Sequence, residues 1–156
     1  MDNMDLDLRS IQEARDLCKY GSAAAERIAK YSEDQIDKIL QNMVRVAEEH
    51  AAELAQMAVE ETGFGKVQDK IYKNHGASTL VYNYIKDMKT QGIISEDPVN
   101  KMFEVADPVG LIMGIIPSTN PTSTVIYKSL IAVKARNAIV FSPHPSALKC
   151  TSRAAR

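Results

Sequence analysis

A short stretch of small polar residues between an apolar run and a helical pattern is the part of the sequence best suited to chemistry. It follows the apolar residues 111–116 and contains Ser118, Thr119 and Asn120. In open α/β sheets, ligands bind beyond the carboxyl ends of strands, where the N-terminus of the next helix offers free N–H groups. This stretch is therefore a candidate ligand site.

Asn120 is the candidate catalytic residue of this stretch. Its side-chain amide has two hydrogen-bond donors, which suits a developing oxyanion. A structural interpretation competes with this one, because Asn-Pro is a common turn dipeptide, and Thr122 with Ser123 suits a helix cap. The sequence contains no GxGxxG, so the usual dinucleotide fingerprint is missing.

The elements around this stretch are predicted from apolar runs and helical periodicity. A strand at 111–116 precedes a helix from about 122 to 135, and a second strand covers 138–141. Ser146 predicts the N-cap of a helix from about 147. This order predicts an α/β fold that begins a doubly wound, Rossmann-like parallel sheet. Two parallel strands cannot cover helices on both faces, so we expect an incomplete fold.

The preceding residues predict a helical layer and a hairpin. Two short helices are expected between about 7 and 29, with a break at Gly21. Ser32 and Gln35 form a capping-box pattern for a helix that runs to about residue 62, and a third helix covers about 66 to 88. A hairpin then ends with a strand at 102–106. We expect the following division: a helical N-terminal part at 1–92, a hairpin region at 93–110, and the start of a nucleotide-binding domain at 111–156.

Composition and charge favour a small-molecule ligand. Nineteen basic and twenty acidic residues give a net charge of -1, which does not favour nucleic acid as a partner. No apolar run approaches the roughly 18 residues needed to span a bilayer, and the acidic start lacks the features of a signal peptide, so we expect a cytoplasmic protein. Cys18 and Cys150 are far apart and have no metal-ligand spacing, so we expect reduced thiols and no metal site.

A long segment carries a specific resemblance. It reads FEVADPVGLIMGIIPSTNPTSTVIYKSLIAVKARNAIVFSPHP, and AVEETGFGKVQDKIYKNHGAS and IKDMKTQGIISED lie upstream. Together they resemble the coenzyme A-acylating branch of the aldehyde dehydrogenase superfamily, over nearly the whole chain from about Ser10. The resemblance is nearest to acetaldehyde dehydrogenases and to the aldehyde dehydrogenase half of aldehyde-alcohol dehydrogenases.

The resemblance implies a reaction and a set of cofactor-binding residues. A Cys thiolate attacks the aldehyde, hydride passes to NAD, and the thioester is transferred to coenzyme A. By position, the residues against the nicotinamide half of the cofactor are Ile115, Ile116, Pro117, Ser118, Thr119 and Asn120. Those near its adenosine half are Ser142, Pro143, His144 and Pro145.

Two departures from the hydrolytic members favour the acylating branch. Hydrolytic members have Pro-Trp-Asn where this chain has Pro117-Ser118-Thr119-Asn120, so the Asn is shifted by one place. They also have a Lys at the position of Ser142, so a preference for NAD over NADP cannot be carried over from them.

The family's nucleophilic Cys lies beyond residue 156, so we expect these 156 residues to be an inactive N-terminal piece. Acetaldehyde is the default substrate, and a homo-oligomer is expected for the full-length protein. The short acidic start leaves little room for a bacterial microcompartment tag. Two alternatives remain open: a non-catalytic binding or assembly module derived from this family, and a hydrolytic aldehyde dehydrogenase.

Overall fold

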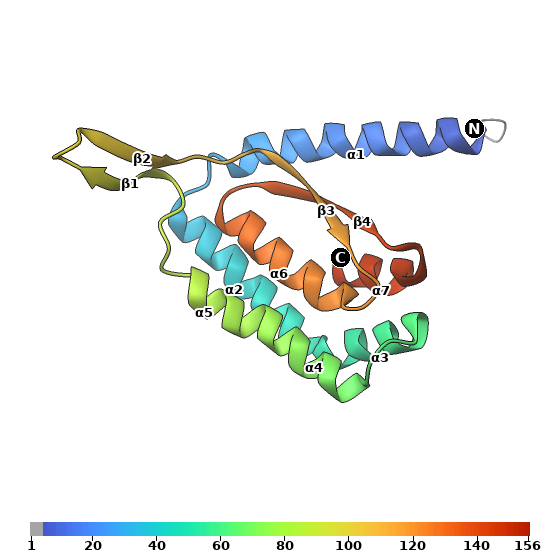
Figure 1. The fold of residues 1–156 in the computed structure, drawn as a ribbon. Coiled ribbons are helices and arrows are strands. Elements are labelled where there is room, and N and C mark those ends of the chain that lie inside the picture. Colours follow the sequence, from blue (N-terminus) through green and yellow to red (C-terminus); the bar gives the residue numbers. More distant parts are fainter. Residues whose placement is uncertain (1–4) are drawn as a thin grey trace.

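The structure is a computed structural model that describes residues 5–156. Residues 1–4, which belong to the acidic start, lie outside the described residues. The α-helices are α1 (Leu6–Ile28), α2 (Glu33–Glu49), α3 (Ala51–Thr62), α4 (Val67–His75), α5 (Val81–Ile85), α6 (Pro121–Lys134) and α7 (Leu148–Ala154). The strands are β1 (Gly92–Asp97), β2 (Met102–Ala106), β3 (Leu111–Ile116) and β4 (Ala138–Pro143), as Figure 1 shows.

Helix α1 is continuous, so the predicted break at Gly21 is wrong. Gly21 stays helical and allows close packing against β3. A Cβ atom at this position would lie 2.5 Å from Cδ1 of Leu111. The missing side chain therefore lets α1 pack closely against the sheet, where it contacts both β3 and β4 (Figure 1).

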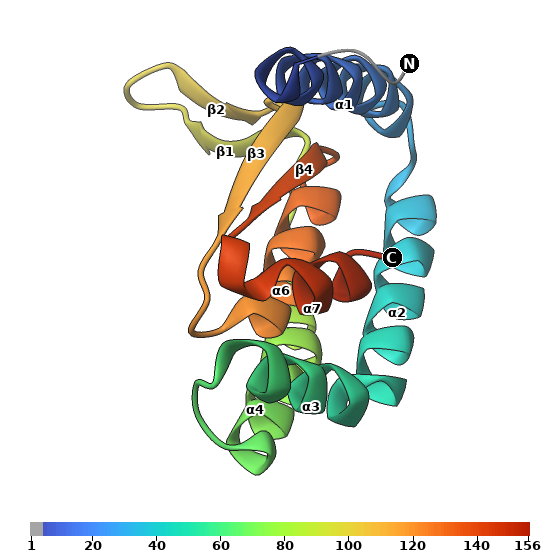
Figure 2. The ribbon, with the colours of Figure 1, turned by 90° about the vertical axis from the view of Figure 1, so that its right-hand side faces the viewer.

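The capping box at the start of α2 is confirmed. The backbone N–H of Gln35 donates to Oγ of Ser32 at 3.3 Å, and the backbone N–H of Ser32 donates to Oε1 of Gln35 at 2.9 Å. The single helix predicted as far as residue 62 is wrong, because the chain changes direction at His50, between α2 and α3 (Figure 2). Helical periodicity continues through such a change of axis, so the sequence pattern does not reveal it.

The predicted helix at about 66 to 88 is also interrupted. A π-helix, Gly76–Leu80, separates α4 from α5, which ends at Ile85. Oγ of Ser78 lies 2.9 Å from the carbonyl oxygen of Asn74 and 3.1 Å from that of His75, which are regular acceptors of the helix backbone. Side-chain hydrogen bonds of this kind compete with the α-helical ladder.

Strands β1 and β2 form the predicted antiparallel hairpin, which projects from the rest of the molecule (Figure 1). Asp97 closes its turn by accepting the backbone N–H groups of Val99 and Asn100, each at 3.0 Å. The ladder is irregular between Ile93 and Ser95.

Strands β3 and β4 are parallel, and α6 is the crossover between them, so the α/β class and the strand order are confirmed. Gly114 and Ile116 on one face of β3 are buried, while Met113 and Ile115 on the other face are 70% and 68% exposed. One face of this two-stranded sheet is therefore open near its carboxyl edge.

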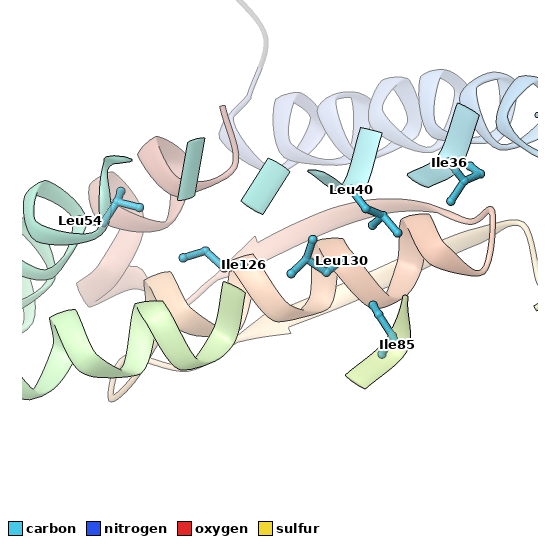
Figure 3. Packing of buried hydrophobic residues seen from close by; sticks show 6 residues of the cluster. All are labelled: Ile36, Leu40, Leu54, Ile85, Ile126 and Leu130. Carbon is cyan, nitrogen blue, oxygen red and sulfur yellow. The ribbon is translucent and has the colours of Figure 1, made fainter. Parts of the chain in front are cut away.

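A hydrophobic core joins the N-terminal helices to α6. Figure 3 shows its buried side chains, which are Ile36, Leu40, Leu54, Ile85, Ile126 and Leu130. Because α6 packs against α2, α3 and α5, the N-terminal helices cover the helix that follows the candidate ligand loop. The division into 1–92, 93–110 and 111–156 stays a prediction. Within the described residues, no helix is both long and apolar enough to cross a membrane.

Candidate functional site

The two predicted ligand segments lie side by side at the carboxyl edge of the parallel sheet. Ile115 pairs with Ser142 and Ile116 with Pro143 in the strand register. Beyond the strands, the backbone N–H of His144 donates to the carbonyl oxygen of Ile116 at 3.1 Å. The fold therefore brings together segments whose paired residues are 27 positions apart in the sequence.

The predicted ligand-binding residues differ in their solvent exposure. Ile115, Pro117, Thr119, His144 and Pro145 are exposed, and Ser118, Asn120, Ser142 and Pro143 are half-buried. Ile116 is only 1% exposed, so its side chain belongs to the interior and only its backbone faces this edge. The edge thus presents apolar and small polar groups next to the start of α6.

The side chain of Asn120 does not cap α6, although the residue holds the N-cap position. Its Oδ1 accepts a hydrogen bond from Nζ of Lys73 at 2.9 Å. Nζ of Lys70 donates to the neighbouring carbonyl oxygen, that of Thr119, at 2.7 Å. Two lysines of α4 therefore hold consecutive residues of the loop, a relationship that the sequence analysis missed.

Asn74 extends the contact between α4 and the loop. It is fully buried, and its Nδ2 donates to the carbonyl oxygen of Ala51 at 3.0 Å. Its Oδ1 accepts from Oγ1 of Thr122 at 2.9 Å. Thr122 is thus tied to α4 and does not cap α6, while Oγ1 of Thr124 donates to the carbonyl oxygen of Asn120 at 2.6 Å.

The positions of Lys70, Lys73 and Asn74 were a signal available in the sequence. Residues at i, i+3 and i+4 share one face of a helix. Two lysines and an asparagine on one helix face are usually taken to be exposed to solvent. The sequence pattern therefore does not show that this face packs against a loop nearly fifty residues away.

Lys70 is a buried cation at this edge. Its side chain is only 4% exposed, and within residues 5–156 no carboxylate forms an ion pair with it. Burial, with the positive charge of Lys73 nearby, lowers the pKa of its ammonium group, although the Cys150 side chain opposes this. Its hydrogen bond to Thr119 partly compensates for the burial.

A carboxylate on α2 fixes the other end of α4. Glu48 accepts hydrogen bonds from His75, Ser78 and Thr79, at and beside the π-helix. Burial raises the pKa of Glu48, but the hydrogen bonds from Ser78, Thr79 and His75 outweigh it and leave the pKa lowered. The cluster therefore pins the helical segment that carries Lys70, Lys73 and Asn74.

The predicted N-cap at Ser146 is wrong. A 3-10 turn, Pro145–Ala147, precedes α7, and Nδ1 of His144 caps that turn by accepting the backbone N–H of Ser146 at 3.2 Å. The first N–H donors of α7 are satisfied by Glu61 on α3, which accepts from Lys149 at 2.8 Å and from Cys150 at 2.7 Å. A distant carboxylate thus replaces a local cap.

Cys150 does not have the surroundings of an activated thiolate. Burial, followed by the hydrogen bond and negative charge of Glu61, raises the pKa of the Cys150 thiol to about 12. Cys18 is exposed on α1. A nucleophilic cysteine requires a lowered pKa, which favours a structural interpretation of Cys150.

A parallel βαβ unit, covered by helices on the crossover side, is the beginning of a mixed α/β fold. The model of the aldehyde dehydrogenase family matches residues 6–156, and the chain belongs to that family.

Individual relatives agree with this assignment. The chain is 46% identical over 146 residues to the bifunctional aldehyde-alcohol dehydrogenase AdhE of Escherichia coli K12, a match that covers 94% of this chain and 16% of that protein. It is 36% identical over 138 residues to the succinate-semialdehyde dehydrogenase (acetylating) of Clostridium kluyveri, covering 88% of this chain and 30% of that protein.

The crystal structure of an acetylating aldehyde dehydrogenase from Geobacillus thermoglucosidasius is similar in fold and sequence. It matches with a TM-score of 0.92 and 60% identity, over 97% of this chain and 34% of that chain. The present chain thus spans about a sixth to a third of the length of these relatives.

Proposed function

We propose that this chain supplies part of the cofactor site of a CoA-acylating aldehyde dehydrogenase. The reaction converts an aldehyde, coenzyme A and NAD⁺ into an acyl-CoA, NADH and a proton, and it is reversible. The observation that carries the proposal is the pairing of the 115–120 and 142–145 segments at one sheet edge, in a chain similar to acetylating enzymes.

The residues at this edge fit a nicotinamide cofactor. Exposed Ile115 and Pro117 offer apolar surface to a flat ring, and the N-terminus of α6 directs its positive dipole end toward the same loop. His144, beside the end of β4, stands where the resemblance puts the adenosine half. We propose NAD as the cofactor, and NADP is an alternative that the experiment below distinguishes.

The residues of this chain act by binding and orientation. When held at this edge by residues 115–120, the nicotinamide would supply the hydride acceptor for the carbon that is being oxidised. Asn120 is proposed to donate its amide hydrogens to the oxygen on that carbon, where negative charge develops after thiolate attack. The attacking thiolate is assigned to neither cysteine of this chain, because Cys150 is buried with a raised pKa and Cys18 lies on α1.

Substrate, assembly and location are part of the same proposal. The relatives include a succinate-semialdehyde dehydrogenase (acetylating) and a sulfoacetaldehyde dehydrogenase (acylating), so the aldehyde varies among them. Acetaldehyde is proposed as the default substrate. A homo-oligomer is proposed because the β1–β2 hairpin exposes apolar side chains, namely Ile93, Ile94, Phe103 and Val105. The cytoplasmic location stays a prediction.

A hybrid enzyme tests the function directly. In it, residues 5–156 of this chain replace the matching third of the Geobacillus thermoglucosidasius enzyme, and the unmodified enzyme is the control. With acetaldehyde, coenzyme A and NAD, we expect NADH and acetyl-CoA in equal amounts. NADH production with free acetate and no need for coenzyme A would support a hydrolytic enzyme instead. A faster reaction with NADP than with NAD would show that NADP is the preferred cofactor.

A further inference from the structure

One face of α4 carries three polar side chains that bind the candidate loop. Lys70 contacts Thr119, Lys73 contacts Asn120, and Asn74 contacts Thr122. These contacts follow the loop into the first turn of α6. The helix therefore holds the last two residues of the loop, Thr119 and Asn120, and the first turn of α6.

The contact of Lys73 determines which way the Asn120 amide is turned. A lysine ammonium group only donates hydrogen bonds, so the group that faces it must be the amide oxygen. The NH₂ group consequently lies on the opposite branch of the amide. Within residues 5–156, no hydrogen bond uses Nδ2 of Asn120, so both of its hydrogens are available to a ligand.

Lys70 makes this arrangement rigid. Its buried side chain donates a hydrogen bond to the carbonyl oxygen of Thr119, the residue next to Asn120. The carbonyl oxygen of Asn120 in turn accepts a hydrogen bond from Oγ1 of Thr124. The backbone that carries the Asn120 side chain is thus fixed by hydrogen bonds at Thr119 and at Asn120 itself. Preorganised donors of this kind stabilise a transition state because they need no reorganisation during the reaction.

We propose that Lys73 is a positioning residue for Asn120. It keeps the amide oxygen away from the substrate and the NH₂ group toward it, and its positive charge polarises the amide so that the N–H groups become stronger donors. This inference rests on the proposed role of Asn120 in the acylating reaction. It adds to that role a specific residue, outside the loop, through which Asn120 is oriented.

A double-mutant cycle in the hybrid enzyme tests the proposal. We expect Asn120→Ala to lower kcat about 100-fold, as for loss of an oxyanion donor, and Lys73→Met to lower it about 10-fold. Because Lys73 acts through Asn120, the double variant should be no slower than Asn120→Ala alone. In Lys73→Met the KM values for NAD and coenzyme A should stay unchanged, and Lys73→Arg should retain more activity than Lys73→Met. Lys38→Met, at an exposed lysine on α2, is the matched control and should leave kcat unchanged.

Nuclear magnetic resonance of the 156-residue chain gives a readout that does not depend on catalysis. Lys73→Met should move the side-chain NH₂ resonances of Asn120 upfield and bring them near those of an exposed asparagine, whereas Lys38→Met should leave them in place. Independent, multiplying effects of the two substitutions on kcat, or unchanged Asn120 resonances in Lys73→Met, would overturn the proposal. If the parent hybrid enzyme makes no acetyl-CoA, the proposed function fails, and the resonance experiment still decides whether Lys73 orients Asn120.

Discussion

The carboxylate of Glu61 accepts the backbone N–H of Cys150 at 2.7 Å, across 89 residues of sequence. Together with the N–H of Lys149, this contact satisfies the start of α7 and ties it to α3. Helix α3 also packs against α7 and the 3-10 turn before it through Ala58, Ala147 and Cys150, which form a small buried cluster. The helix after the second ligand segment is therefore positioned by an acidic residue in the N-terminal half.

The capping role of Glu61 predicts a loss of stability in Glu61→Gln. The neutral amide has a weaker acceptor and loses the favourable interaction with the helix dipole, so we expect the free energy of unfolding to fall by about 1 kcal/mol. Urea unfolding followed by circular dichroism measures this change. Glu60→Gln, at an exposed neighbouring position, is the control. An equal loss of stability in both variants would contradict the capping role of Glu61.

The environment of Cys150 predicts low thiol reactivity. Its thiol is fully buried, and its pKa is raised to about 12, so almost no thiolate forms at pH 8. We expect iodoacetamide to alkylate exposed Cys18 and to leave Cys150 unmodified until the chain unfolds. Peptide mass spectrometry in the absence and presence of urea distinguishes the two thiols. Rapid alkylation of Cys150 in the folded chain would contradict the structural interpretation.

The contact between Glu53 and Arg153 predicts a specific loss of stability in acid. Hydrogen bonds from Arg153 and then His50 lower the pKa of Glu53 from 4.5 to about 2. Because the pKa is lower in the folded state, the stabilisation is present above pH 4.5 and is lost as the pH falls toward 2. Glu53→Gln removes this titration.

Urea midpoints measured from pH 6 to pH 2 test this prediction. The difference in stability between the unsubstituted chain and Glu53→Gln should shrink steadily below about pH 4.5. Asp34→Asn, at an exposed acidic residue in the first turn of α2, serves as the comparison. A difference that stays constant across this range would show that Arg153 does not stabilise the Glu53 carboxylate.

The close packing around Gly114, in the sheet beside the candidate loop, leaves no room for a side chain at this position. A Cβ atom there would lie 2.9 Å from Cδ1 of Phe141 and 3.0 Å from Cδ1 of Ile139 on the adjacent strand. Gly114→Val should therefore overpack the sheet and lower the free energy of unfolding by about 1 to 3 kcal/mol. Met113→Val, on the open face of β3, should have a much smaller effect. Thermal unfolding of both variants measures the contrast, and equal effects would argue against overpacking.

Local patterns in the sequence determined most of the elements around the site. The run of apolar residues predicted β3 with its observed bounds, and Ser32 with Gln35 predicted the start of α2. Such signals depend on backbone sterics and on hydrogen bonds between residues a few positions apart. The order of strand, helix and strand then placed both ligand segments at one edge, since parallel strands end on the same side.

Tertiary structure decided what holds those segments. The sequence suggests that Gly21 breaks a helix, but in the structure it allows close contact between α1 and Leu111. The sequence suggests Ser146 as the cap of the last helix, but Glu61 on α3 accepts the first N–H groups of that helix. Lys73 meets Asn120 across 47 residues. Such pairs depend on how helices pack, and packing depends on the shape of the whole core, which no local pattern encodes.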